Sequence, residues 1–459
     1  MVQGVSTDAI REQYSQAPAK EGVRGVSHGR LLVIVLLLAL AFRLAIAPLG
    51  FNRQDRRDYI SSAQKATRYG VSRFYDAEPN EKENRHSPVP YPPIPVYFYT
   101  IAGQLYQNLV DPTFREIENW RSVPVDSILL NYLIEIPAFI FESLLTLVIF
   151  FFVRRRYGGR QAIVCASLYA LNPAILFNGA GWAQPDAIHS FFLTLAVAFL
   201  IERKPVFYLP MLVLAILSKP QPTVIAAAIL VVGIFNSTGR ELIRGFLASV
   251  ATAGVILLPF LLYVESIPRM VKVISSAHPF ISINAHNVWW LEGYLLNINP
   301  RWLRDDTAAF LGLTYLGVSL LVFFCFYSSA LVRELCRPAQ RINAEPFPYI
   351  GLMFFVIAVR MHENHAIQVL PLLLLTGLVL ARQRLIFATL SLTILANMVL
   401  HTRELFGEPV SPLLQYLRAL NAALNLTIFL YWTYSFFKGS VVDVSNTFRR
   451  GLARGVHLC

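Results

Sequence analysis

"IPVYFYTIAGQLYQNLV", residues 94–110, decides the topology, because it is apolar enough to count as a membrane span yet rich in aromatic and amide side chains. The chain around it is strongly apolar. Of its 459 residues, 55% are hydrophobic and only 15% are charged, whereas a typical soluble domain carries about 25% charged residues. We therefore predict an all-α fold, a polytopic transmembrane helical bundle without a large soluble domain.

Long apolar runs predict about twelve spans if residues 94–110 are left out, because a span needs about 20 apolar residues. The expected spans are 31–49, 127–153, 161–181, 185–201, 206–218, 222–236, 245–264, 308–332, 346–359, 366–381, 385–401 and 417–436. Counting 94–110 as a thirteenth span would place "RRRYGG" (154–159) and "RQR" (382–384) outside. Positively charged loops normally face the cytoplasm. The count of twelve is therefore preferred.

This topology divides the chain into three parts. Residues 1–30 are expected to be a cytoplasmic N-terminal tail, residues 31–437 the transmembrane domain and residues 438–459 a basic cytoplasmic C-terminal tail. Residues 50–126 then form a long first extracytoplasmic loop. Within it, 94–110 is expected to be a helix lying at the membrane interface, where aromatic side chains are favoured.

Composition also excludes several classes of protein. The net charge of +12 lies mostly in short loops and tails, so it indicates membrane orientation rather than a nucleic-acid partner. None of the four cysteines (Cys165, Cys325, Cys336 and Cys459) lies in an expected outside loop, so no disulfide framework is predicted. Nucleotide-binding and serine-hydrolase motifs are absent. Energy for a reaction should therefore come from an activated, membrane-borne substrate.

The unusual polar motifs gather on the extracytoplasmic side, mostly at the mouths of spans. They are residues 53–59, 91–95, 182–187, 219–222, 283–293 and 360–365. Polar groups and broken helices at membrane depth are tolerated where they line a wet cavity, and they commonly mark a functional site.

The first motif, "RQDRRDY", holds two candidate bases, Asp55 and Asp58. A carboxylate here could deprotonate a hydroxyl at the membrane surface. The neighbouring arginines could bind a phosphate. Alternatively, the arginines neutralise both aspartates and the motif is a solvated charge cluster.

Two further motifs place charge inside apolar surroundings. Asn172 and Pro173 interrupt a helix, after which Asp186 lies between two spans with almost no loop. Asp186 could serve a site, or cap the next helix. Lys219 lies within an apolar stretch, where a lone lysine costs about 2.5–3.5 kcal/mol. A lipid-linked phosphate would offset that cost, and snorkelling to the interface is the alternative.

The remaining motifs are "YPPIP" (91–95) and "RMHENH" (360–365). The prolines predict a rigid aromatic wall, or simply a joint leading into the interfacial helix. Arg360 with His362 suits an anion clamp. The spacing of His and Glu differs from that of zinc-ligand motifs, so a metal is not expected.

In this order, these motifs resemble the polytopic glycosyltransferases of the GT-C superfamily over about residues 30–370. The chain is most similar to the GPI-mannosyltransferase-like group and, more distantly, to the dolichyl-phosphate-glucose-dependent glucosyltransferases. The matching positions are Asp55, Tyr59, Gly70, Phe74, Tyr75, Tyr91, Pro92, Pro93, Asn172, Pro173, residues 182–186, Lys219, Pro220, Gln221, Ala285, Asn287, Trp289, Arg360, His362 and Glu363.

The chain departs from the family pattern at three places. Ser62 stands where the family usually has Trp, Ala183 where it has Gly, and "QDRRD" where it has "GD". The last departure leaves the choice between Asp55 and Asp58 open, although the offset to Gly70 favours Asp55.

The resemblance implies that a hexose, with mannose favoured, passes from a polyprenyl-phosphate sugar to an acceptor hydroxyl on the extracytoplasmic face, with inversion. The implied base is Asp55 or Asp58. The residues expected to bind the donor and its phosphate are Arg56, Lys219, Gln221, Arg360 and His362. The residues expected to line the substrate pocket are Tyr91, Gln184, Asp186, Asn287, Trp289 and Glu363.

The expected partners are the lipid-linked sugar donor, membrane lipids and a glycan, lipid or protein acceptor, with no nucleic acid. No cofactor is expected, and a divalent cation is not favoured. The absence of an outside glycosylation sequon favours a bacterial plasma membrane over the endoplasmic reticulum. A transporter or flippase of lipid-linked saccharides is the main alternative, although many transporters show repeated halves that are not seen here. A non-catalytic subunit is a third, and would not need Asp55 or Asp186.

Overall fold

The computed structural model describes residues 27–75, 91–117, 122–263, 265–276, 278–336, 342–405 and 410–452. Most of the expected N-terminal tail, residues 76–90 of the expected first loop and the last seven residues lie outside these ranges. The side chains of 276, 403–405 and 439–452 are not described.

The described chain is almost entirely helical. Its helices are α2 (His28–Ile46), η1 (Ala47–Leu49), α3 (Arg53–Tyr69), α4 (Pro93–Leu109), η2 (Phe114–Glu116), α5 (Ile128–Tyr157), α6 (Gly159–Ala170), α7 (Pro173–Leu176), η4 (Phe177–Gly181), α8 (Asp186–Ile201), α9 (Pro205–Ile216), α10 (Thr223–Asn236), α11 (Gly239–Leu261), α12 (Ser266–Ser276), α13 (Val288–Leu295), α14 (Tyr315–Leu335), α15 (Pro346–Ile357), α16 (Val369–Leu374), α17 (Ala381–Leu405) and α18 (Pro412–Leu452). The short strands are β1 (Ser282–Ile283), β2 (Ala308–Phe310), β3 (Leu313–Thr314) and β4 (Met361–His362).

Within the described ranges, seven helical segments are long and apolar enough to cross a membrane by length and composition: α2 with η1, α5, α6 through η4, α11, α14, α17 and the first part of α18. Four shorter apolar helices are α8, α9, α10 and α15. Large apolar side chains such as Phe246 and Leu258 of α11 are exposed, as expected of a surface that faces lipid. The chain is thus a helical integral membrane protein, and the count of twelve spans stays a prediction.

Two expected spans differ from the structure. Residues 308–314 form the β2–β3 hairpin instead of the start of a helix, because Leu311 and Gly312 take left-handed backbone angles, with φ of 49° and 78°. In the expected span 366–381, the only α-helix is the short α16. Its continuation is broken by turns at Gly377 and Leu378, which are also left-handed.

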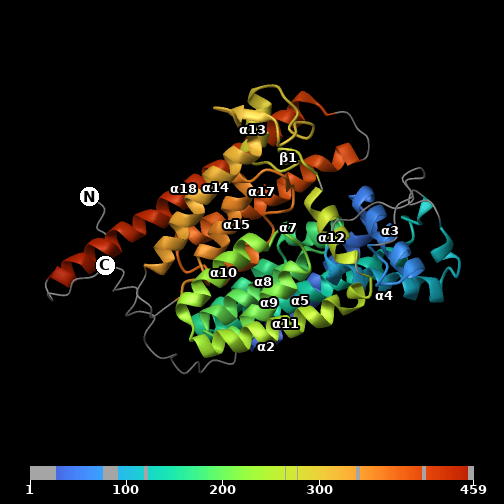
Figure 1. Cartoon of the computed structure of the whole chain (residues 1–459), viewed down its shortest axis with the longest axis horizontal. Coiled ribbons are helices and arrows are strands. Elements are labelled where there is room, and N and C mark those ends of the chain that lie inside the picture. The colour runs from blue at the N-terminus through green and yellow to red at the C-terminus, as the bar shows by residue number, and fades with distance from the viewer. Residues whose placement is uncertain are drawn as a thin grey trace.

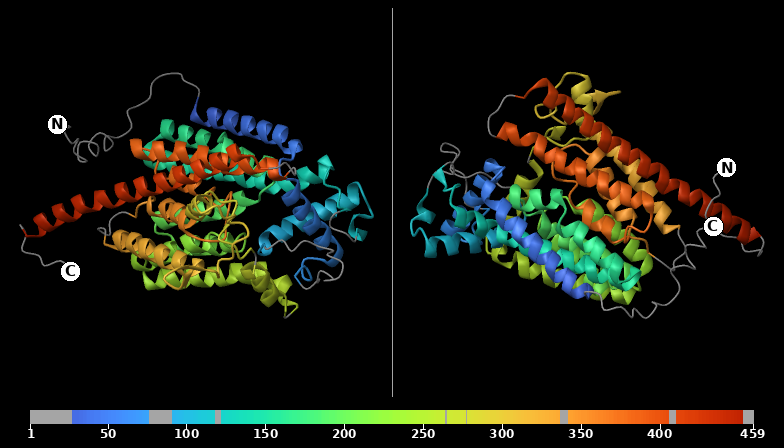
Figure 2. Two further views of the ribbon diagram at one scale, coloured as in Figure 1. Left: turned by 90° about the horizontal axis from the view of Figure 1, so that it is seen from above. Right: turned by 180° about the vertical axis from the view of Figure 1, so that it is seen from behind.

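The bundle consists of two groups of helices (Figure 1). In one group, α5 packs on α6 and α8, and α9 packs on α8 and α11. In the other, α14 packs on α15, and α17 packs on α18. Helix α10 contacts both α15 and α8, so it joins the groups. The C-terminal part of α18 extends beyond the bundle in all three views (Figures 1 and 2).

The first loop forms a cap of helices at one end of the bundle, where α3 and α4 lie side by side (Figure 1). The expected helix at 94–110 is confirmed as α4, which begins at Pro93. Its aromatic side chains pack with α3 in a small core that includes Tyr59, Tyr99 and Tyr106. The Ile94 amide donates to the Leu217 carbonyl at 3.0 Å, which fixes the start of α4 to the end of α9.

Two buried ion pairs lie along α5, and one of them holds this cap on the bundle. Arg43 of α2 pairs with Glu142 of α5, and both are almost completely buried. Arg56 of α3 donates to Glu135 of α5 at 2.7 Å and to the Ala47 carbonyl at 2.7 Å. Glu135 and Glu142 are seven residues apart and therefore lie on one face of α5. A buried charge is tolerated when it is paired, so these contacts fix where α3 begins.

We predict that Gly103→Val weakens the packing of α4 on α3. A Cβ at Gly103 would approach the Ala63 carbonyl oxygen to 2.6 Å and also collide with the Thr67 hydroxyl. Overpacking of this kind costs about 1–3 kcal/mol, which thermal unfolding in detergent should report as a lower midpoint. The matched control is Gly254→Ala, where a Cβ meets nothing within 4 Å. Equal midpoints for both variants would contradict the close approach.

We also predict that Arg56→Met destabilises the protein by about 3–5 kcal/mol, because it leaves the Glu135 carboxylate buried without its partner. The double variant Arg56→Met with Glu135→Leu should recover most of the loss, because no buried charge then remains. Denaturation in detergent measures both. A double variant that is as unstable as the single one would show that the ion pair is not what Arg56 contributes.

Candidate active site

The carboxylate of Asp55 lies in the first turn of α3. The side chain of Asn52 caps this helix by accepting a hydrogen bond from the Asp55 amide at 3.0 Å. The N-terminus of a helix favours a negative charge. The Asp55 side chain is half-buried, and its Oδ2 accepts a hydrogen bond from Nε2 of Gln184. The carboxylate of the expected base is therefore hydrogen-bonded to a side-chain amide from a distant part of the chain.

The segment between α6 and α8 delivers Gln184. As predicted, Asn172 and Pro173 interrupt the helix: the Asn172 side chain caps α7 by accepting from the Ala174 amide at 2.9 Å. One turn of π-helix follows in η4, and Ala183 takes a left-handed φ of 57°. π-Turns and left-handed residues often occur at functional sites. This irregular path turns Gln184 toward Asp55.

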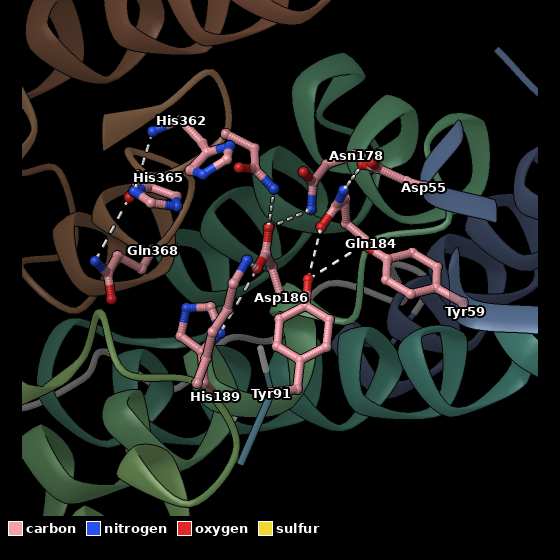
Figure 3. Close-up of polar contacts among 12 residues, drawn as sticks. Asp55, Tyr59, Tyr91, Asn178, Gln184, Asp186, His189, His362, His365 and Gln368 are labelled. Carbon is pink, nitrogen blue, oxygen red and sulfur yellow. Dashed lines mark hydrogen bonds and ion pairs between the residues drawn. The ribbon is translucent and has the colours of Figure 1, made fainter. Parts of the chain in front are cut away.

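Asp186 is the centre of a buried polar cluster (Figure 3). Its carboxylate is an ion-pair partner of Lys219, and it accepts hydrogen bonds from Asn364 at 2.6 Å and from Asn178 at 3.2 Å. It is the first residue of α8, and the helix has no side-chain cap. The alternative in which Asp186 caps α8 through its side chain is therefore wrong.

Lys219 is buried, so the alternative in which it snorkels to the interface is wrong. Its ammonium pairs with Asp186 and lies 5.6 Å from the centre of the Tyr91 ring. A cation in this position is stabilised both by the carboxylate and by the face of the ring.

Tyr91 connects the proline-rich segment to the site. Its hydroxyl lies 3.1 Å from that of Tyr59 and 3.5 Å from Oε1 of Gln184. Burial raises the pKa of Tyr91 to about 12, so it remains a neutral hydrogen-bonding group at ordinary pH. Its ring and that of Tyr99 flank Tyr59, with centroids 6.0 and 5.7 Å away, and form the expected aromatic wall.

The acidic groups of the site influence one another. Burial raises the pKa of Asp55 well above its usual range, and negative charge on Glu363 and then on Asp58 raises it further. Glu363 is itself buried, and its Oε2 has no partner among the described residues. Burial raises the pKa of Glu363 to about 7. Burial thus favours the protonated form of both carboxyl groups, and Glu363 changes protonation near neutral pH.

Several other candidates lie close to this cluster but make separate contacts. Asp58, one turn after Asp55, accepts from Nε2 of Gln54 at 3.2 Å. Gln221 follows Lys219, and its buried Oε1 has no partner in the described part of the chain. Arg360, at a left-handed φ of 62°, donates to Asp305 at 2.5 Å.

Three candidates make structural contacts instead. Arg56 is held in the ion pair with Glu135. Asn287 caps α13 and donates to the Ala358 carbonyl at 3.2 Å. Trp289 donates through its indole N–H to the Ile357 carbonyl at 2.8 Å. Asn287 and Trp289 thus tie α13 to the end of α15.

Sequence reasoning missed the amide partners of Asp186. Asn178 lies in the π-turn and Asn364 lies in the "RMHENH" motif, so each was near a recognised signal. The segment 361–365 is positioned by parallel pairing of β4 with β1. Within the described ranges, no group of three or more His, Cys, Asp or Glu side chains is arranged to hold a metal ion.

No family model matches the chain, and neither does any curated protein. Among solved structures, it is similar to ArnT from Cupriavidus metallidurans in the apo state, with 12% identity and a TM-score of 0.46 over 88% of this chain and 76% of that one. For the same protein bound to undecaprenyl phosphate, the identity is 13% and the TM-score is 0.44, over 91% of this chain and 78% of that one. Identities this low and TM-scores below 0.5 define neither a shared fold nor a shared activity.

Proposed function

We propose that this protein is an integral membrane glycosyltransferase that transfers a hexose, with mannose favoured, from a polyprenyl-phosphate sugar to an acceptor hydroxyl. The observation that carries the proposal is the Asp55 carboxylate. It is half-buried, has a raised pKa and is held by Gln184 beside the buried pair of Asp186 and Lys219. A half-buried carboxylate with a raised pKa and a fixed hydrogen-bond partner in a polar cluster suits the role of a general base.

The reaction would be a single displacement at the anomeric carbon. The acceptor oxygen forms a bond to that carbon as the bond to the phosphate oxygen breaks, and the hydroxyl proton passes to Asp55. The lipid phosphate leaves as an anion without needing a proton, so one carboxylate can suffice where soluble glycosidases use two. Attack from the face opposite the leaving group inverts the configuration.

The neighbours of Asp55 would position the reactants. Gln184 fixes one oxygen of the Asp55 carboxylate, and Tyr91 can orient the amide of Gln184. Asp186 is a poor candidate for the base because three donors already engage its carboxylate. We place the site on the extracytoplasmic face on the positions of the basic loops. We favour a bacterial plasma membrane because the expected outside loops carry no glycosylation sequon.

We predict that Asp55→Asn lowers the rate of sugar transfer by about 10²–10⁴-fold, the usual contribution of a general base. Asp58→Asn should retain most of the activity, because Asp58 only adds negative charge near the base. The measurement is transfer of labelled sugar from polyprenyl-phosphate donors by the purified protein.

If Asp55→Asn and Asp58→Asn lower the transfer rate equally, Asp55 is not the specific general base. If no donor supports transfer while the protein moves labelled lipid-linked sugar across proteoliposomes, the transporter alternative replaces this proposal.

We predict that Glu363→Gln moves the acid limb of the pH profile of kcat/KM to lower pH. Activity needs Asp55 without its proton, and the charge on Glu363 raises the pKa of Asp55. Removing that charge lets Asp55 lose its proton at a lower pH. The matched control is Asp306→Asn, since Asp306 is exposed and paired with Arg304. An unmoved limb, or a limb that moves equally in the control, would contradict the coupling.

A further inference from the structure

Three imidazoles form a row beside the polar cluster of Asp186 and Lys219. The rings of His278 and His362 have centroids 4.9 Å apart, and so do those of His362 and His365. His278 is exposed, whereas the other two are half-buried, so the row leads from the surface inward. Figure 3 shows His362 and His365 on the segment that also supplies a donor to Asp186.

The cations that would be expected to receive a phosphate are already paired. Arg56 pairs with Glu135, Lys219 with Asp186, and Arg360 with Asp305. Each of these pairs is close to neutral as a unit. An arriving phosphate that relied on these side chains would have to break an ion pair, which is costly when the carboxylate is buried.

The histidines differ, because none of the three is paired with a carboxylate within the described ranges. Nδ1 of His365 accepts a hydrogen bond from the His362 amide at 3.2 Å. This leaves its proton on Nε2, where the ring can donate to a ligand. The three rings are therefore groups that can gain charge when an anion arrives.

We propose that His278, His362 and His365 form the receptor for the phosphate group of an isoprenyl phosphate, and that the row takes up a proton when the phosphate binds. The identity of the ligand rests on the proposed function, because a polyprenyl phosphate is the group that such a transferase releases. The new elements are the roles of His278 and His365 and the gain of a proton.

The electrostatics of the row support proton uptake. Burial lowers the pKa of all three histidines. Neighbouring histidines and Lys219 lower the pKa of His362 and His365 further. The row is therefore neutral at neutral pH when empty. A bound phosphate dianion raises the pKa of an adjacent imidazole, so the bound state holds more protons.

The expected pH dependence of phosphate binding follows from this rise in the pKa of the imidazoles. A ligand that raises the pKa of a group binds more tightly below the pKa of the complex, and its affinity falls as pH rises through that value. The groups on other elements that act on the pKa of the row are His189 of α8 and Lys219 of the loop before α10. On the segment of the row itself, Glu363 lies between His362 and His365 and has a pKa of about 7. Asp186 also lies near but is neutralised by its partner Lys219.

The test is calorimetric binding of a short-chain isoprenyl phosphate to the full chain in detergent, between about pH 6.5 and 8.5, in buffers of different ionisation enthalpy. We expect net proton uptake by the wild type. His278→Asn and His365→Asn should each weaken binding by about tenfold at pH 7, equivalent to about one pKa unit, and should reduce the uptake. His28→Asn in α2, far from the row in sequence, is the matched control. His278 is exposed, so its variant should fold normally.

Two further ligands identify what is recognised. If inorganic phosphate also binds through the histidines, the receptor is supported and recognises the phosphate group alone. If only the isoprenyl phosphate binds, the receptor is supported and recognises the phosphate on its lipid. If the isoprenyl alcohol binds as well as the phosphate, or the histidine variants bind like the wild type without loss of proton uptake, the inference is overturned.

The binding test also separates this inference from the proposed function. Sugar transfer by the wild type with unchanged phosphate binding in the histidine variants would overturn the receptor alone. Histidine-dependent binding of isoprenyl phosphate without transfer from any sugar donor would overturn the transferase alone.

Discussion

The architecture of the site depends on the buried charge of Asp186. A carboxylate inside an apolar bundle is tolerated only when it is paired and hydrogen-bonded. Here its partners come from three other segments: Asn178 from the π-turn, Lys219 from the loop between α9 and α10, and Asn364 from the loop after β4. Satisfying one charge therefore brings together loops that are far apart in sequence. Gln184 lies two residues before Asp186 on the same segment, and its side-chain amide donates a hydrogen bond to Asp55.

The sequence predicted most helices because their signals are local. Apolar runs, the prolines at the start of α4 and the interruption at Asn172 each act over a few residues. The two misplaced spans depended on backbone conformation instead. Leu311 and Leu378 are apolar, yet both take left-handed angles that end or delay a helix. Hydropathy alone does not register such turns.

Single residues of the candidate site could be predicted from the sequence, but which residues contact one another could not. Asp55, Asp186 and Lys219 were singled out because each is a charge close to an apolar span, and the structure brings them together. That Arg56 is bound to Glu135 could not be foreseen, because the pairing is 79 residues apart in sequence and depends on how α3 meets α5. Asn287, which was expected to line the substrate pocket, likewise donates to backbone carbonyls.

The central claim is that a single carboxylate, Asp55, serves a direct displacement at the anomeric carbon. The most direct measurement is the configuration of the product, determined by NMR on the glycoside formed from a polyprenyl-phosphate sugar of known configuration. The account predicts complete inversion, because the acceptor oxygen itself attacks the anomeric carbon while Asp55 only takes its proton. A product that retains the donor's configuration would contradict it.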